Sequence, residues 1–176
     1  MDLASLVDTA EQMPQYPLHS WQPEVQGSID ICIHADGSWW HEGSPIKRHK
    51  LVQLFSRLLV YADGFYSLVT PSERLFIEVE NLPFQIVQAE QNSDDVWQLT
   101  TSVGDQICLE KAEQIRVDTL ILDAVPEILI RDNLWASISR QAYYDMALTV
   151  ETTITEQGHI AHLRSGDSVL VFGIIE

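Results

Sequence analysis

One pattern of elements occurs twice along this chain of 176 residues, and it constrains the fold more than any other feature. In the first copy, residues 29–80, isoleucines alternate with polar residues from Ile29 to Ile33, which is the period-two pattern of a half-buried strand. Asp36 and Gly37 then supply residues that tolerate the positive φ angles of a tight turn, so the pattern predicts a β-hairpin that returns through Trp39–His41.

A helix and two more strands follow in the first copy. Ser44 is placed to cap the helix, and Pro45 suits the first helical position because a missing N–H costs nothing there. Asp63 and Gly64 mark a turn after the helix, and alternating apolar residues predict two strands that end at Val79. The apolar face of the predicted helix consists of Leu51, Leu54, Phe55, Leu58 and Leu59.

The second copy, residues 128–176, repeats this order in a diverged form. Trp135 follows Trp40 by 95 residues, and Gly158 follows Gly64 by 94. A nearly constant offset through several types of element indicates an internal duplication.

We therefore expect an α+β protein with two related strand-strand-helix-strand-strand units, whose sheets are covered by helices at 45–60 and 139–150. A β-rich middle segment of alternating residues joins the two units. The expected organisation is an N-terminal helix and extended connector at 1–28, the first unit at 29–90, the middle segment at 91–127 and the second unit at 128–176. These parts are small enough to form one compact domain.

The charge balance narrows the classes of partner. The net charge is −16 at pH 7, and such an acidic surface repels phosphate backbones, so neither nucleic-acid binding nor adhesion to an anionic membrane is expected. Met1–Gln12 lacks the features of a signal peptide, and no stretch reaches the length of a membrane-spanning helix. The lone Cys32 and Cys108 suit a reducing compartment, and we expect a cytoplasmic protein.

Short catalytic motifs are absent from the sequence. It has no glycine-rich phosphate loop, no Gly-x-Ser-x-Gly elbow, no His-Glu-x-x-His helix and no repeated Cys-x-x-Cys. His34, Asp36, His41 and Glu42 flank one hairpin, but their spacing matches no specific metal site. No catalytic residue, metal or cofactor is therefore assigned.

The most unusual local feature is a basic stretch in an acidic chain. Lys47, Arg48 and Lys50, with His49 among them and Arg57 further on, fall within eleven residues. Three of these cations would lie in the first turns of a helix, where the macrodipole disfavours them. They could instead bind the phosphate or carboxylate of a small ligand.

Two alternatives concern the surroundings of this stretch. Nearby carboxylates, such as Asp36, Glu42 and Glu73, could neutralise the cations. Trp39 and Trp40 are adjacent and must point to opposite faces of a strand, so one belongs to the core and the other could line a ligand groove. We include Trp39 with Lys47, Arg48, His49 and Lys50 in the candidate ligand-binding set.

The arginines suggest a structural role for the tryptophans. Arg48 and Arg140 hold matching places in the two copies, as Trp40 and Trp135 do, and cation–π pairs between them would attach each turn to its helix.

Many residues of the chain also match the pattern of a known family. They are Trp21, Pro23, Glu24, Gly27, Asp36, Gly37, Trp40, Pro45, Ile46, Arg48, Leu51, Phe55, Asp63, Gly64, Tyr66, Leu68, Thr70, Pro71, Glu73, Val79, Glu80, Pro83 and Phe84. In these positions the chain resembles the bacterial domain of unknown function 1285, over roughly Trp21 to the C-terminus. The resemblance implies a fold of repeated α+β motifs and a role in signal transduction, and it brings no catalytic residues. Asn81 departs from the pattern, which has an acidic residue there.

The function expected from these observations is that of a non-enzymatic module that binds a small anionic ligand or a protein partner. One alternative is a hydrolase-like enzyme that uses Asp36, His41 and Glu42, which a perturbed pKa in a concave pocket would favour. Another is a structural homo-oligomer assembled through edge strands such as Ser168–Ile175.

Overall fold

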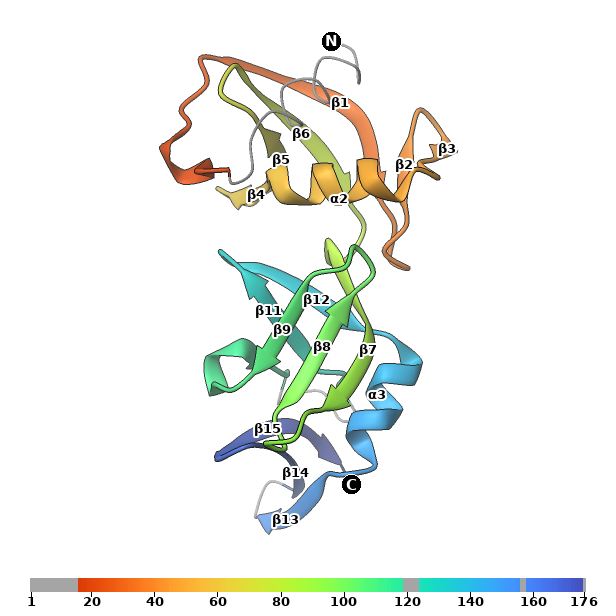
Figure 1. Cartoon of the computed structure of the whole chain (residues 1–176), viewed down its shortest axis with the longest axis vertical. Helices are drawn as coiled ribbons and strands as arrows, with labels where there is room; N and C mark the ends of the chain where they lie inside the picture. The colour runs from red at the N-terminus through yellow and green to blue at the C-terminus, as the bar shows by residue number, and fades with distance from the viewer. Residues whose placement is uncertain (1–15, 119–123, 156–157, 176) are drawn as a thin grey trace. The chain divides into compact units, whose positions relative to one another are not determined.

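The computed structural model describes residues 16–118, 124–155 and 158–175. The chain divides between Pro83 and Phe84 into two compact units, each described here by itself (Figure 1). The helix expected near the N-terminus falls among residues 1–15, outside the described residues.

The first unit is built on one six-stranded sheet with the strand order β3-β2-β1-β6-β5-β4. Strands β1 and β6 pair in parallel, and every other neighbouring pair is antiparallel. The elements in chain order are the 3₁₀ turn η1 (Leu18–Ser20), β1 (Val25–Ile33), β2 (Trp39–His41), β3 (Ser44–Pro45), α2 (His49–Leu58), β4 (Leu59–Ala62), β5 (Phe65–Val69) and β6 (Glu73–Val79).

Helix α2 covers one face of this sheet, and the core of the unit lies between them (Figure 1). Phe55 and Leu58 of the helix are fully buried, as are Ile31 and Ile33 of β1. The ring centroids of Trp39 and Phe55 lie 6.4 Å apart, which ties β2 to the helix. The alternation seen in the sequence therefore corresponds to one buried and one more open face of the sheet.

The second unit contains two sheets. A six-stranded sheet has the order β10-β11-β12-β7-β8-β9, with β12 and β7 parallel, and a three-stranded antiparallel sheet has the order β13-β14-β15. The elements are β7 (Phe84–Gln91), β8 (Trp97–Thr101), β9 (Gln106–Leu109), the 3₁₀ turn η2 (Ala112–Gln114), β10 (Ile115–Arg116), β11 (Glu127–Arg131), β12 (Leu134–Ile138), α3 (Arg140–Ala147), β13 (Glu151–Thr155), β14 (Gly158–Ser165) and β15 (Ser168–Ile175). Helix α3 packs against β7.

The expected α+β class is wrong, because the protein is mostly β. Strands account for 52% of the structure, and only two α-helices, of ten and eight residues, occur among the described residues. Strands β8, β9 and β10, within residues 97–116, belong to the same sheet as β11 and β12. The middle stretch therefore increases the strand content and contains no α-helix.

Apart from β3, which the second copy lacks, the two copies keep the same order of elements but form different sheets. In the first copy β1 takes its parallel partner, β6, from the end of the same copy. In the second copy β12 takes its parallel partner, β7, from a strand that precedes the copy, and β13–β15 form a separate sheet. Because sheets are assembled from pairings distant in sequence, the repeated order did not determine a repeated fold.

The expected start of the first helix is also wrong. Ser44 and Pro45 form the short edge strand β3, paired with His41 and Trp40, and α2 begins at His49. The turn between β2 and β3 has positive φ angles at Glu42 and Gly43, 48° and 70°. Proline is tolerated in an edge strand because no ladder hydrogen bond from its nitrogen is required there.

The predicted turn at Asp63–Gly64 is confirmed, and a similar turn occurs at Asp132–Asn133 in the second copy. Both residues of each pair have positive φ, 55° and 85° in the first turn and 41° and 63° in the second. This geometry suits the right-handed twist of the flanking strands.

No helix within the described ranges is long and apolar enough to cross a lipid bilayer.

Candidate functional site

The basic island, defined as residues 47–50, lies in the loop before α2 and in its first turn. The side chains of Lys47, Arg48, His49 and Lys50 are all exposed. Arg48 is the N-cap residue of α2, and its side chain caps no backbone N–H; the first turn has no acidic residue. The positive end of the helix is thus flanked by cations, an arrangement that favours an anion nearby.

Asp36, one of the carboxylates expected to neutralise the island, is engaged elsewhere. Among the described residues, no ion pair within 4.0 Å involves Lys47, Arg48 or Lys50. Asp36 accepts a hydrogen bond from the backbone N–H of Ser38 at 2.9 Å. Hydrogen bonds from Ser38 hold the pKa of Asp36 below its usual range.

The two adjacent tryptophans separate as strand geometry requires. Trp39 is only 2% exposed and belongs to the core of the first unit. Its indole N–H has no hydrogen-bond partner within the described part of the chain. Trp40 is half-buried on the other face, where its Nε1 donates to Ser38 Oγ at 3.0 Å.

The cation–π contacts differ from those suggested by the repeat. The guanidinium of Arg116 lies 4.0 Å from the ring centroid of Trp135, and that of Arg140 lies over Tyr144 at 5.6 Å. In the second unit the tryptophan is therefore contacted by an arginine of β10, two strands away in the same sheet, rather than by α3.

A second cluster, which sequence reasoning missed, lies on the open face of the first sheet. Cys32, His34 and Glu80 each place one metal-ligating atom within 4.8 Å of the others. His34 Nδ1 lies 2.8 Å from Glu80 Oε1, and the other oxygen of Glu80 accepts a hydrogen bond from the backbone N–H of Ala35 at 2.9 Å. We call these three residues the Cys-His-Glu cluster.

The sheet register explains why these three side chains meet. Cys32 lies in β1, and His34 is the residue directly after this strand. Their side chains point to the same face of the sheet because residues two apart in extended backbone do so. Ile33 pairs with Val79 in the parallel ladder between β1 and β6. His34 and Glu80 directly follow this pair, at the ends of two strands that run the same way.

The surroundings of the cluster are acidic. Burial, followed by the negative charges of Glu80, Glu78 and Asp30, raises the pKa of the Cys32 thiol above its usual value. An acidic setting favours a cation and disfavours a free thiolate. Cys32 is therefore poorly suited to act as an unassisted nucleophile.

A shallow hollow of about 400 Å³ lies along β1 and β6, where their ladder is interrupted between Ser28 and Cys32. Asp30 and Glu78 line it, beside apolar side chains of both strands. Such irregularities re-aim side chains and are common beside functional sites.

Residues of the hydrolase alternative are distributed along one hairpin. Asp36 lies in the turn before β2, His41 is the last residue of β2, and Glu42 lies in the turn after it. Successive turns of antiparallel strands lie at opposite ends of the shared strand, so β2 separates Asp36 from Glu42.

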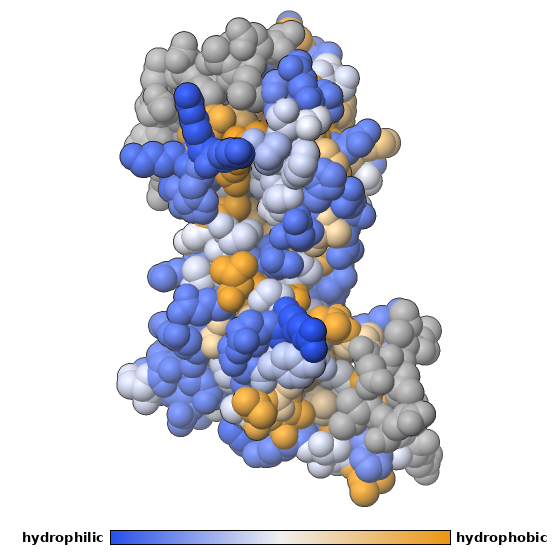
Figure 2. Space-filling view, turned by 90° about the vertical axis from the view of Figure 1, so that its right-hand side faces the viewer, coloured by the Kyte–Doolittle hydropathy of each residue, from blue (hydrophilic) through white to orange (hydrophobic). Residues whose placement is uncertain are grey.

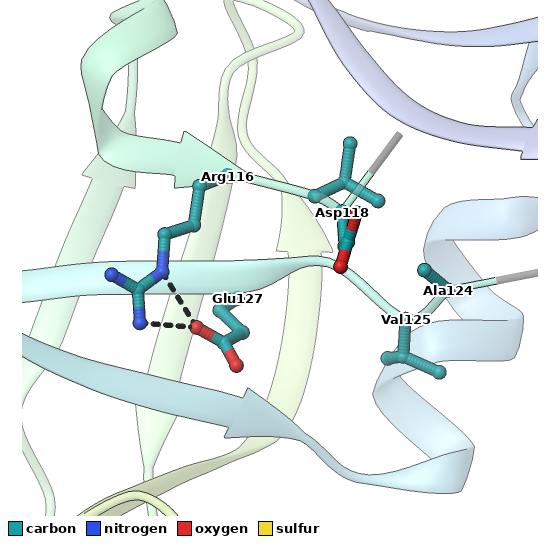
Figure 3. Close-up of a pocket in the computed structure, with 6 residues that line it drawn as sticks. Arg116, Asp118, Ala124, Val125 and Glu127 are labelled. Carbon is teal, nitrogen blue, oxygen red and sulfur yellow. Dashed lines mark hydrogen bonds and ion pairs between the residues drawn. The ribbon is translucent and has the colours of Figure 1, made fainter. Parts of the chain in front are cut away.

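The second unit has a hollow of about 520 Å³ beside β10 and β11 (Figure 3). Arg116 and Glu127 face each other there from neighbouring strands and form an ion pair. Asp118, Ala124 and Val125 line its other side. The guanidinium is thus already shared between a carboxylate and an aromatic ring, and it offers little to a further anion.

Exposed apolar side chains are scattered over both units. Hydrophilic residues cover most of the face in Figure 2, and hydrophobic residues show there as separate spots. The most exposed large apolar side chains, Leu148 at 86%, Ile154 at 76% and Phe65 at 63%, come from three different elements or loops. None of this indicates one continuous apolar docking surface on the face shown.

The fold and these clusters define a β-rich protein of two units, whose chemically distinctive side chains lie at exposed ends of strands and of a helix. The model described as "Domain of unknown function (DUF1285), N-terminal domain" matches residues 16–82. The model described as "Protein of unknown function (DUF1285), C-terminal domain" matches residues 83–171. The chain therefore belongs to the DUF1285 family, as the sequence resemblance predicted.

Two crystal structures of the family are similar to this chain. A DUF1285 family protein from Silicibacter pomeroyi DSS-3 is 30% identical, with a TM-score of 0.79 over 97% of this chain and 95% of that chain. A DUF1285 family protein from Shewanella baltica OS155 is 27% identical, with a TM-score of 0.55 over 65% of this chain and 87% of that chain. A comparison with curated proteins gives no match.

Proposed function

We propose that this protein is a non-enzymatic binding module whose basic island captures an anionic group. The observation that carries the proposal is that Lys47, Arg48 and Lys50 are exposed and, within the described residues, have no acidic partner. In a chain with 26 acidic and only 10 basic side chains, carboxylates that could pair with these three cations are plentiful. Cations left unpaired at the positive end of a helix favour a phosphate or carboxylate supplied from outside.

The anionic group belongs either to a small ligand or to an acidic segment of a protein partner. The island is an open surface, which suits both, and the shared chemistry is a carboxylate or phosphate held by a guanidinium, ammonium groups and backbone N–H groups. The resemblance to the family adds a role in signal transduction to this proposal. Cys32 and Cys108 are free thiols, which supports a cytoplasmic location.

A thermal-shift assay with a matched control variant tests the proposal. The probes are inorganic phosphate, citrate and an oligoglutamate peptide, added to the wild type, to Arg48→Ala and to Arg57→Ala. Arg57 is also exposed but lies in the last turn of α2, so its removal deletes the same charge at the other end of the helix.

We expect a binding probe at 100 times its Kd to stabilise the wild type and Arg57→Ala by about 2.7 kcal/mol. The shift should be much smaller for Arg48→Ala. A response to phosphate or citrate would indicate a small ligand, and a response to the peptide alone would indicate a protein partner. If Arg48→Ala and Arg57→Ala respond equally, the island is not the binding site.

A homo-oligomer receives less support from the edge strand first considered. The Ser168 side chain of β15 donates to the carbonyl of Glu110, and β15 also contacts η2 and β10 within the same unit. The free edge of the three-stranded sheet is β13, in which all five residues are exposed. Light scattering would measure the mass directly.

A further inference from the structure

We propose that Cys32, His34 and Glu80 bind a single divalent metal ion of the Zn²⁺ type. Their side chains supply a thiol sulfur, an imidazole nitrogen and a carboxylate oxygen, the three donor types that proteins use for zinc. They are the one group of three or more such side chains that the described residues bring close enough to share an ion. The inference is independent of the basic island.

The distances suit an ion with small movements of the side chains. Zinc binds sulfur at about 2.3 Å and nitrogen or oxygen at about 2.0 to 2.2 Å, which sets neighbouring ligand atoms about 3.3 to 3.8 Å apart in a tetrahedron. The three donor atoms of the cluster lie within 4.8 Å of one another, and His34 Nδ1 and Glu80 Oε1 are 2.8 Å apart. His34 Nδ1 and Glu80 Oε1 must separate slightly to admit the ion, a change that side-chain rotations supply.

Backbone contacts already hold two of the three ligands in place. The His34 N–H donates to the carbonyl of Ser38 at 2.9 Å, and the His34 carbonyl accepts from Gly37 at 2.9 Å. Ala35 N–H fixes Glu80 Oε2, which leaves Oε1 directed at the imidazole. Supporting contacts of this kind orient metal ligands in known sites.

An aromatic ring supports the imidazole as well. The ring of Trp40 meets that of His34 edge-on, with centroids 5.1 Å apart. Trp40 is itself held by the hydrogen bond of its indole N–H to Ser38. The imidazole is thus confined before any ion arrives, which lowers the entropic cost of ligation.

Charge and access also favour a cation here. Glu78 and Asp30 act on Cys32 together with Glu80, so the ion would enter a field of negative charge. The side chains of His34 and Glu80 are 37% and 47% exposed, which leaves an open path and room for a fourth ligand such as water. In the metal-free form His34 Nδ1 and Glu80 Oε1 are in direct contact at 2.8 Å, and the ion would take its place between them.

Metal titration of the full chain tests this inference. The protein, stripped with a chelator, is titrated with Zn²⁺ against a competing chromophoric chelator, and with Co²⁺ while visible absorbance is recorded. Variants Cys32→Ser, His34→Gln and Glu80→Gln remove the ligands one at a time, and Cys108→Ser is the matched thiol control because Cys108 is exposed and distant in sequence. Circular dichroism checks that each variant is folded.

We expect one tightly bound ion per chain and, with Co²⁺, the charge-transfer band of a cobalt–thiolate bond. Each ligand variant should weaken Zn²⁺ binding by at least about tenfold, since even the loss of a supporting residue costs that much in known sites. Cys108→Ser should bind as the wild type does.

Alkylation of the wild type gives a second readout that needs no variant. Zn²⁺ should protect Cys32 from iodoacetamide and leave Cys108 reactive, with the modified residue identified by mass spectrometry. The inference is overturned if Cys32→Ser retains the cobalt–thiolate band, if Cys108→Ser loses it, or if Zn²⁺ protects neither thiol or both alike.

Discussion

Replacement of Trp39 tests directly whether this residue is a core element or part of a ligand site. Trp39 is 2% exposed, and its ring packs against Phe55 at 6.4 Å. A buried tryptophan removes about 150 to 250 Å² from water, worth about 4 to 6 kcal/mol at about 25 cal/mol per Å². Because unfolded chains already bury some surface, this is an upper estimate, and Trp39→Ala should destabilise the first unit by about 3 to 5 kcal/mol.

The conservative change at the same position should cost far less. Trp39→Phe keeps an aromatic ring beside Phe55 and removes an indole N–H that has no partner among the described residues. A buried donor without a partner costs about 1 to 3 kcal/mol, and its removal offsets part of the lost packing. We expect Trp39→Phe to destabilise the unit by less than about 2 kcal/mol.

Thermal melting followed by circular dichroism measures both effects, and hydrogen exchange shows which unit loses protection. For a unit of this size about 1 kcal/mol corresponds to about 4 to 8 °C, so Trp39→Ala should lower the Tm by at least about 12 °C. Trp40→Ala, on the more open face, is the matched control and should have a smaller effect. A Trp39→Ala protein that melts within about 2 °C of the wild type would refute the buried placement, and phosphate binding weakened by Trp39→Phe would return Trp39 to the ligand site.

Three further predictions concern the helix ends and the thiols. Arg48→Asp should stabilise the first unit by about 0.5 to 1 kcal/mol in thermal melts, because it provides an N-cap acceptor and a negative charge at the start of α2, while it abolishes anion binding; a destabilised variant would contradict the N-cap assignment. Ser139→Ala should destabilise the second unit by about 1 kcal/mol in urea unfolding, because the Ser139 hydroxyl accepts from the N–H of Ala142 at 3.3 Å, and an unchanged midpoint would show that this cap contributes nothing. In metal-free protein at pH 8, iodoacetamide should modify Cys108 faster than Cys32, because the pKa of the Cys32 thiol is raised. The raised pKa also means that the protonated thiol of Cys32 stabilises the folded state below the ordinary thiol pKa, and that this stabilisation is lost as the pH rises through the raised pKa. Cys32→Ser should therefore flatten the alkaline loss of Tm.

Local features of this fold follow closely from the sequence. The alternation at Ile29–Ile33 became β1, and the residue pairs Asp63–Gly64 and Asp132–Asn133 became turns with positive φ. Each of these depends on the conformational preferences of neighbouring residues, which act over a few positions. Membership of the DUF1285 family was likewise readable from the residues.

The first helix shows where local signals compete. Ser44 and Pro45 fit a helix start as well as an edge strand. They form a strand because the turn at Glu42–Gly43 brings them alongside β2, with which they pair. A glycine after a residue that can adopt positive φ was the available signal for that turn. The helix then begins at His49, with cations rather than a capping side chain at its start.

The sequence by itself indicated most of the strands, the tight turns and the approximate places of the two helices, because these follow from residue preferences at short range. Only the tertiary structure decided the mostly β class, since the parallel pairings of β1 with β6 and of β12 with β7 join segments far apart in the chain. The pairing of β1 with β6 also created the Cys-His-Glu cluster. Period-two alternation already places Cys32 and His34 on one face, but Glu80 lies 46 residues beyond His34 in sequence and reaches the imidazole only because the register aligns Ile33 with Val79.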